Sequence, residues 1–165
     1  MADDNNNPQG EAAQGQFSLQ RIYLKDLSFE SPLGVEAFKQ AWQPKINQDL
    51  NTIVNKVEDD LYEVILKMTV SAVIEDKTVF LVEVQQAGLF VVRQLEPRQM
   101  AQIFNTVCPQ ILFPYAREVI DSCAVKGTFP ALAIPPINFD ALFLRAMQQA
   151  QAAQAEKDAA QPVTN

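Results

Sequence analysis

Four segments of the chain alternate apolar and polar residues with the period of two that is typical of a β-strand. The alternation is cleanest in residues 62–75, where every even-numbered side chain is apolar or aromatic. Residues 17–30 and 45–57 alternate in a similar way, whereas residues 78–92 (TVFLVEVQQAGLFVV) are apolar on both faces. Because short acidic turns separate the last three segments, the pattern predicts an antiparallel sheet.

The first strand is predicted to have one apolar and one polar face. Its apolar face is expected to carry Phe17, Leu19, Tyr23, Leu27 and Phe29. Its polar face is expected to carry Ser18, Gln20, Asp26, Ser28 and Glu30. Acidic side chains would then point to solvent.

The segment between the first two strands, residues 31–44, has no clear period and contains two prolines and a glycine. We interpret it as a long crossing loop that carries two aromatic side chains, Phe38 and Trp42. Since residues 78–92 have a second apolar face, something has to cover part of it. Either this loop folds over that face or a partner protein binds there.

After Val92 the apolar residues recur every three or four positions, which predicts helices. The first helix is expected to begin at Pro97, since proline fits the first turn of a helix, and to end at Pro109. A second helix is expected from Pro114 to Gly127, where glycine favours a helix end.

The remaining sequence predicts an extended, proline-rich linker over residues 128–137 and a last helix that begins at Asn138 or Asp140. Together the segments predict an α+β fold, with a four-stranded antiparallel sheet followed by helices packed on one face. The expected organisation is a disordered N-terminal tail (1–16), a single domain (17–154) and a flexible C-terminal tail (155–165).

Composition and charge narrow the class of protein. A chain of 165 residues with a formal net charge of −7 has the size of one domain and is too acidic to favour a nucleic-acid partner. The N-terminus lacks the features of a secretory signal, and no apolar run approaches the roughly 18 residues of a membrane span. We therefore expect a cytoplasmic protein without direct membrane insertion. Cys108 and Cys123 lie among apolar neighbours and are expected to be buried thiols.

Residues for catalysis or cofactor binding do not form a recognisable motif. The chain has no histidine, the commonest general base and metal ligand, and its five glycines form neither a phosphate loop nor a dinucleotide motif. The paired carboxylates lie in predicted tails or turns, where they are expected to be solvated. The sequence therefore predicts a protein that is not an enzyme and that has no metal or cofactor.

Six sequence strings resemble, in order, the SecB family of bacterial protein-export chaperones. They are QRIYLKDLSFESP, WQP, LYEVILKMTVSA, FLVEVQQAGLF, CPQILFPYARE and GTFPALAIPPINFDALF. The resemblance spans Phe17 to Phe143 and leaves out both ends of the chain. It implies a four-stranded antiparallel sheet with helices on one face, assembled as a homotetramer that is a dimer of dimers.

The function implied by the resemblance is that of an ATP-independent holding chaperone. Such a protein binds unfolded precursor proteins in the cytosol and delivers them to the SecA motor ATPase of the general secretion translocon. The alternative is an oligomeric adaptor that binds folded partners through an acidic face of the sheet.

The resemblance also implies a SecA-docking face, formed by Asp26, Glu30, Leu81 and Glu83. The period of two agrees with this, because it places Asp26 and Glu30 on one face of their strand and Leu81 and Glu83 on one face of theirs. Carboxylates beside a leucine suit a basic partner segment. The alternative for this face is simple solvation.

Two further sets of residues match family positions. The tetramer interface is expected to involve Val82, Val84 and Gln86, on a face that also packs the subunit's own core. The candidates for a groove that binds client polypeptides are Trp42, Phe113, Tyr115 and Phe143. Aromatic rings suit such a groove because they offer a large apolar area, although each of these residues could instead belong to the core.

Overall fold

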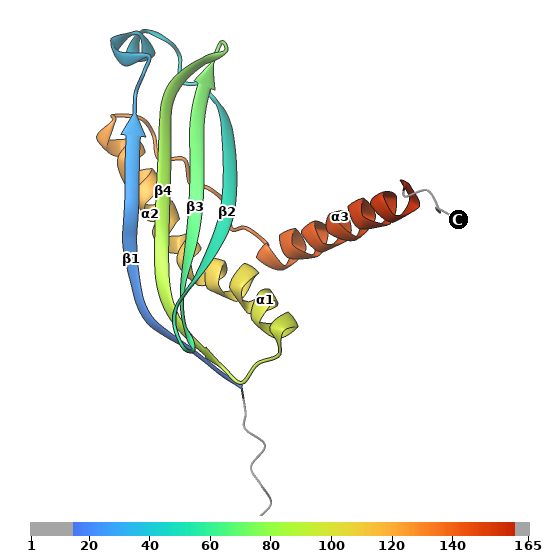
Figure 1. Cartoon of the computed structure of the whole chain (residues 1–165). Helices are drawn as coiled ribbons and strands as arrows, with labels where there is room; N and C mark the ends of the chain where they lie inside the picture. The colour runs from blue at the N-terminus through green and yellow to red at the C-terminus, as the bar shows by residue number, and fades with distance from the viewer. Residues whose placement is uncertain (1–14, 161–165) are drawn as a thin grey trace, which may run out of the picture.

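The computed structural model describes residues 15–160, with side chains described as far as residue 157. Within this range the strands form one antiparallel sheet in the order β1-β4-β3-β2, as Figure 1 shows. The strands are β1 (Gln16–Glu30), β2 (Lys45–Glu58), β3 (Leu61–Ile74) and β4 (Lys77–Arg93). The helices are a 3-10 helix η1 (Gly34–Lys39), α1 (Pro97–Asn105), α2 (Val107–Lys126) and α3 (Phe139–Ala160). The predicted α+β fold is confirmed.

Tight turns join β2 to β3 and β3 to β4. The second turn has two central residues, Glu75 and Asp76, whose φ angles are 48° and 60°. Two successive positive φ angles define a type I′ turn, whose twist matches that of the flanking strands. In the first turn Asp60 has a φ of 63°, a conformation that aspartate tolerates better than most residues. Both turns lie where the sequence predicts them.

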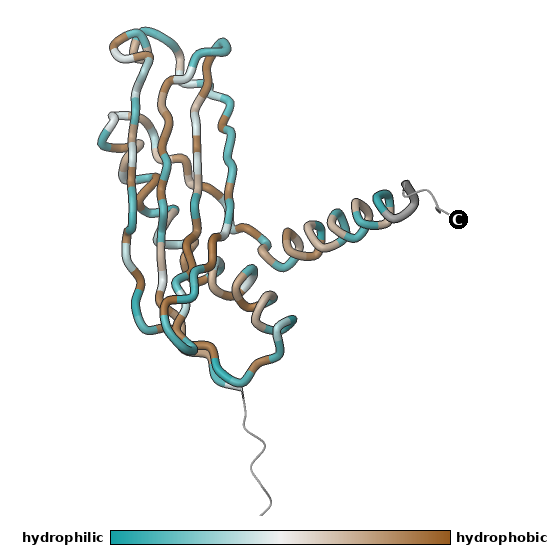
Figure 2. The backbone as a smooth tube through the Cα atoms, viewed as in Figure 1, coloured by the Kyte–Doolittle hydropathy of each residue, from teal (hydrophilic) through white to brown (hydrophobic). Residues whose placement is uncertain are grey.

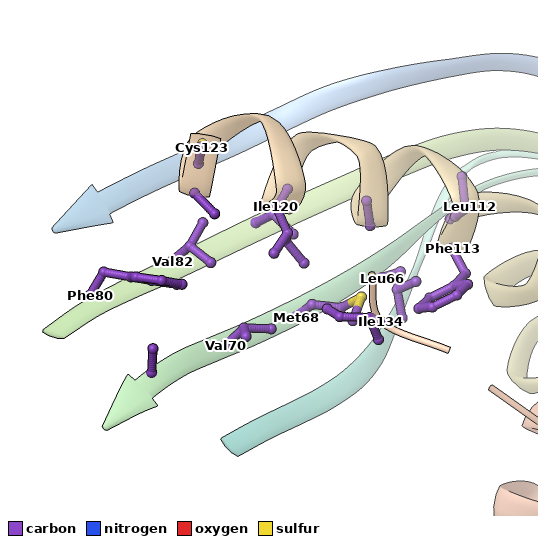
Figure 3. Packing of buried hydrophobic residues seen from close by; sticks show 14 of the residues in the cluster. Leu66, Met68, Val70, Phe80, Val82, Leu112, Phe113, Ile120, Cys123 and Ile134 are labelled. Atoms are coloured by element: carbon purple, nitrogen blue, oxygen red, sulfur yellow. The ribbon is translucent and has the colours of Figure 1, made fainter. Parts of the chain in front are cut away.

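The inner face of the sheet, defined here as the face that α1 and α2 cover, holds the core. Even-numbered side chains of β3 and β4 point into it, and Val82 lies close to Ile120 and Cys123 of α2 (Figure 3). Leu66 and Met68 are fully buried there. Figure 2 shows the resulting alternation of hydrophobic and hydrophilic residues along the strands. Helix packing on one face of the sheet is therefore confirmed.

Strand β1 differs from the predicted alternation because it contains two bulges. Its pairing with β4 shifts between Leu19 and Arg21 and again between Leu24 and Asp26. Each extra residue reverses which side chains point to a given face of the sheet. Tyr23 pairs with Ala87 and so lies on the outer face, not on the apolar face as the sequence predicts.

The helix boundaries also correct the sequence prediction. The break between α1 and α2 falls at Thr106, and Pro109 lies in the first turn of α2 instead of ending α1. A proline is tolerated there because the first amides of a helix have no acceptor within it. Pro114 lies inside α2 and not at its start. The burial of α2 against the sheet offsets the hydrogen bond that this proline removes.

The crossing loop packs on the inner side of the sheet. Trp42 stacks on Phe80 and Phe129, with ring centroids 6.2 and 5.4 Å apart, and Phe38 stacks on Phe129 at 5.5 Å. Phe80 belongs to the core of β4. Phe38 and Trp42 therefore do not cover the outer face of β4, as the loop was expected to do if no partner bound there.

Helix α3 projects away from the sheet, as Figure 1 shows. The side chain of Asn138 accepts a hydrogen bond from the amide of Ala141 at 2.9 Å, so Asn138, and not Asp140, is the cap of the two that the sequence allows. The helix continues to Ala160, six residues into the segment 155–165 that the sequence predicts to be a flexible tail. Residues 161–165 and nearly all of the predicted tail 1–16 lie outside the described residues.

Candidate partner-docking and client-binding surfaces

The four predicted docking residues lie together on the outer face of the sheet. Glu30 pairs with Leu81, Ser28 with Glu83 and Asp26 with Gln85, across the adjacent strands β1 and β4. Directly paired residues of an antiparallel sheet point to the same face. We call the surface formed by Asp26, Glu30, Leu81 and Glu83 the acidic face. Its two β1 carboxylates are exposed, and Leu81 and Glu83 are half-buried.

A second polar group on the outer face joins three strands. Glu63 of β3 accepts hydrogen bonds from Lys25 Nζ at 2.7 and 2.8 Å, from Asn55 Nδ2 at 3.0 Å and from the Tyr23 hydroxyl. Tyr23 and Lys25 belong to β1, which is separated from β3 by β4. The small side chain of Ala87 on β4 lets them reach across. We call Tyr23, Lys25, Asn55 and Glu63 the Glu63 cluster.

The electrostatics of this cluster favour an ionised Glu63. Burial alone would raise the pKa of Glu63, but hydrogen bonds from Lys25, Tyr23 and Asn55 and the charge of Lys25 lower it to about 2. Burial, followed by the hydrogen bond to Glu63, raises the pKa of Tyr23 to about 12. Glu63 therefore stays charged, and Tyr23 neutral, over the physiological pH range.

Sequence reasoning missed this cluster, since none of its four residues is among the candidate site residues named from the sequence. Glu63 is only 8% exposed, and Ile65, which points to the same outer face, is also buried. The available signal was the position of Glu63 beside the apolar Ile65 on the same face of the strand, which indicates that this face is partly buried. Its partners could not be read, because Tyr23 and Lys25 are 40 and 38 residues away along the chain.

The predicted tetramer-interface residues lie on the inner face. Val82 and Val84 are fully buried by the subunit's own core, and Gln86 is almost fully buried. Gln86 lines a surface pocket of about 520 Å³ between β1 and α2, together with Tyr115. The two valines are thus core residues, and their role in assembly stays a prediction.

The structure does not bring the four predicted client-binding aromatics into one groove. Trp42 lies in the stack with Phe80 and Phe129, whereas Phe113 is buried against Phe139. Tyr115 is 51% exposed beside the pocket at β1, and Phe143 is half-buried in a pocket of about 290 Å³ between α1 and α3. Among the described residues no ring contact joins any two of the four.

Both cysteines lie in the interior of the subunit. Cys108 and Cys123 are both buried free thiols, as predicted, and burial raises the pKa of Cys108 to about 12. A thiol with such a pKa is a poor nucleophile at neutral pH. Between residues 15 and 160, every helix is too short or too polar to cross a bilayer.

The α+β fold of this chain has been seen before in a solved structure. The structure resembles a SecB-like chaperone from Mycobacterium tuberculosis that was solved in complex with a ChAD peptide from the HigA1 antitoxin. The TM-score is 0.61 at 15% sequence identity, over 74% of this chain and 88% of that one.

Sequence comparison then defines the family. Residues 10–150 match the model of SecB, the preprotein translocase subunit. The protein-export protein SecB of Cellvibrio japonicus is 56% identical over 99% of both chains. That of Hahella chejuensis is 55% identical over 84% of this chain and 87% of the relative. The chain belongs to the SecB family of protein-export chaperones.

Proposed function

We propose that the protein is an ATP-independent holding chaperone, which binds unfolded precursor polypeptides in the cytosol and delivers them to the SecA motor. Membership of the SecB family supports the chaperone and export roles. The observation that favours delivery is the acidic face, where three carboxylates share one face of the sheet with the half-buried Leu81.

The chemistry of the acidic face suits a basic segment of SecA. Carboxylates attract such a segment over a distance and so raise the rate of encounter, whereas contact with Leu81 adds apolar area at short range. An adaptor that binds folded partners would use the same surface, and only the choice of ligand separates the two functions.

Client binding is best supported by aromatic rings that the fold leaves accessible. Phe38 is 58% exposed and lies on Phe129, next to the half-buried Trp42. Together these rings form a stacked platform at one end of the sheet. Flat apolar surfaces of this kind bind unfolded chains with little dependence on sequence, because any apolar side chain can contact them.

Assembly into a homotetramer is supported by apolar side chains that the single chain leaves uncovered. Leu24 and Leu27 of the edge strand β1 and Tyr115 of α2 are among the exposed large hydrophobic residues. Leu24 and Tyr115 border the same pocket between β1 and α2. A second copy of the chain would cover this region and the free edge of β1.

Native mass spectrometry with and without a denatured precursor tests assembly and client binding together. We expect a tetramer that gains the mass of the precursor, and we expect the protein to suppress light scattering by the refolding precursor without ATP. A monomer that leaves the scattering unchanged would exclude the chaperone function. Binding to a native protein combined with indifference to denatured ones would favour the adaptor.

A further inference from the structure

The Glu63 cluster lies beside the acidic face and contains a cation that could neutralise it. Lys25 directly precedes Asp26 in β1. Its ammonium lies on the outer face, because it contacts Glu63, whose register partner Leu89 points outward. A lysine has a long flexible stem, so a released Lys25 could turn towards Asp26.

The structure shows where the charge of Lys25 goes instead. Both carboxylate oxygens of Glu63 accept hydrogen bonds from its ammonium, so the two charges compensate each other. Among residues 15–157, none of the ion pairs involves Asp26, Glu30 or Glu83. The acidic face therefore keeps its negative charge although a lysine lies within it in sequence.

The bulge in β1 makes this arrangement possible. The pairing of β1 with β4 shifts between Leu24 and Asp26, so Lys25 has no register partner of its own. This extra residue lets the Lys25 side chain join Asp26 on the outer face and still extend back to Glu63. Without the bulge, Lys25 and Asp26 would point to opposite faces of the sheet, as consecutive strand residues do.

We propose that Glu63 is a positioning residue for docking: it holds the Lys25 ammonium away from Asp26 and so keeps the acidic face negative for a basic partner segment. This inference rests on the proposed docking to SecA. It assigns to Glu63 a role in binding in addition to its role in joining three strands.

The test replaces Glu63→Gln in the full-length chaperone and measures the Kd for SecA. Glutamine has nearly the same shape and still offers an oxygen to Tyr23 and Asn55, but it no longer compensates the charge of Lys25. We expect binding about three- to tenfold weaker at low ionic strength, because a free cation now opposes the basic segment. The difference should shrink as salt screens the charges.

Two control variants separate this role from a purely structural one. Adding Lys25→Gln to Glu63→Gln removes the freed cation, so we expect the double variant to bind within about twofold of the original protein. A structural role predicts the opposite, since the double variant loses one more member of the cluster. Glu58→Gln makes the same change in net charge at an exposed site at the opposite end of the sheet, and we expect it to bind normally.

The outcomes distinguish failure of this inference from failure of docking. If Glu83→Lys weakens binding but Glu63→Gln does not, or if the double variant binds as weakly as Glu63→Gln, the positioning role is wrong and docking stands. If the original protein does not bind SecA, or if Glu83→Lys binds equally well, the docking proposal itself fails.

A folding defect in Glu63→Gln, detected by circular dichroism and native mass, would move the test to Lys25→Gln alone. This variant leaves an additional uncompensated carboxylate on the outer face. Binding that is equal or tighter than that of the original protein supports the positioning role. Weaker binding overturns it, because it would mean that Lys25 itself contributes to the contact.

Discussion

The two faces of the central strands β3 and β4 are built from the same backbone but depend on different interactions. On the inner face, Val64, Leu66 and Met68 are fully buried in the hydrophobic core. On the outer face, Glu63 is also buried, but its carboxylate accepts hydrogen bonds from three side chains. Apolar burial is non-directional, whereas the Glu63 cluster needs each partner in place. The inner face should therefore determine stability, and the outer face should determine charge and specificity.

The largest expected effect comes from weakening the inner face. Leu66→Ala should lower the free energy of unfolding by about 3–4 kcal/mol, because it removes a fully buried side chain and leaves a cavity under α2. Urea denaturation followed by circular dichroism measures this change. An effect below about 1 kcal/mol would show that α2 adds little to the core and would remove the proposed contrast between the faces.

The next effect tests the charge of Glu63 on the outer face. The pKa of Glu63 is lowered from 4.5 to about 2, so its ionised form favours the folded state. This stability is fully present above pH 4.5 and is lost as the pH falls towards 2. Relative to Glu63→Gln, the original protein should lose on the order of 2 kcal/mol over this range. If the stabilities of the two proteins change in parallel from about pH 6 to about pH 2, the lowered pKa of Glu63 is wrong.

A smaller effect should appear in binding and not in folding. Glu83→Lys reverses one charge of the acidic face, so we expect SecA binding to weaken about tenfold while suppression of precursor aggregation persists. Surface plasmon resonance measures the first and light scattering the second. Equal loss of both activities would mean that Glu83 serves the fold, and the separation between the faces would not hold.

The smallest effect on stability is expected for Leu81→Ala, the apolar member of the acidic face. Leu81 is half-buried on the outer face, so its truncation should cost less than about 1 kcal/mol of unfolding free energy. SecA binding should weaken about two- to fivefold as apolar contact is lost. Comparison with Leu66→Ala gives the same chemical change on the two faces of one sheet. Equal costs for the two would contradict the comparison.

The sequence predicts the inner face well and the outer face only in part. Periodicity was sufficient for β3 and β4, since burial selects apolar side chains at every second position. It failed in β1, because Lys25 in a bulge is indistinguishable in sequence from any other polar strand residue. The helix boundaries were predicted wrongly at Pro109 and Pro114, which both lie within α2. Proline disfavours the interior of a helix, but tertiary packing can override this preference.

The acidic face and the Glu63 cluster illustrate the same limit. Asp26 and Glu30 could be placed on one face by their spacing, and the second bulge lies just before both, so it leaves that spacing intact. The contacts of Glu63 depend on the strand order, in which β4 lies between β1 and β3, and only the folded sheet determines this order. Family resemblance suggested the four candidate docking residues, but it suggested neither Tyr23 nor Lys25.

The two bulges make β1 longer than the segment of β4 with which it pairs. The 15 residues of β1 span the 13 residues from Leu81 to Arg93. Because the two insertions cancel, Phe17 and Phe29 point to the same face, and only the middle of the strand is reversed. Removing both Gln20 and Lys25 would give a regular strand with unchanged ends. Deleting either one alone would remove a single bulge and leave every other side chain on its present face, so β1 should tolerate the loss of a bulge residue better than the loss of a paired one.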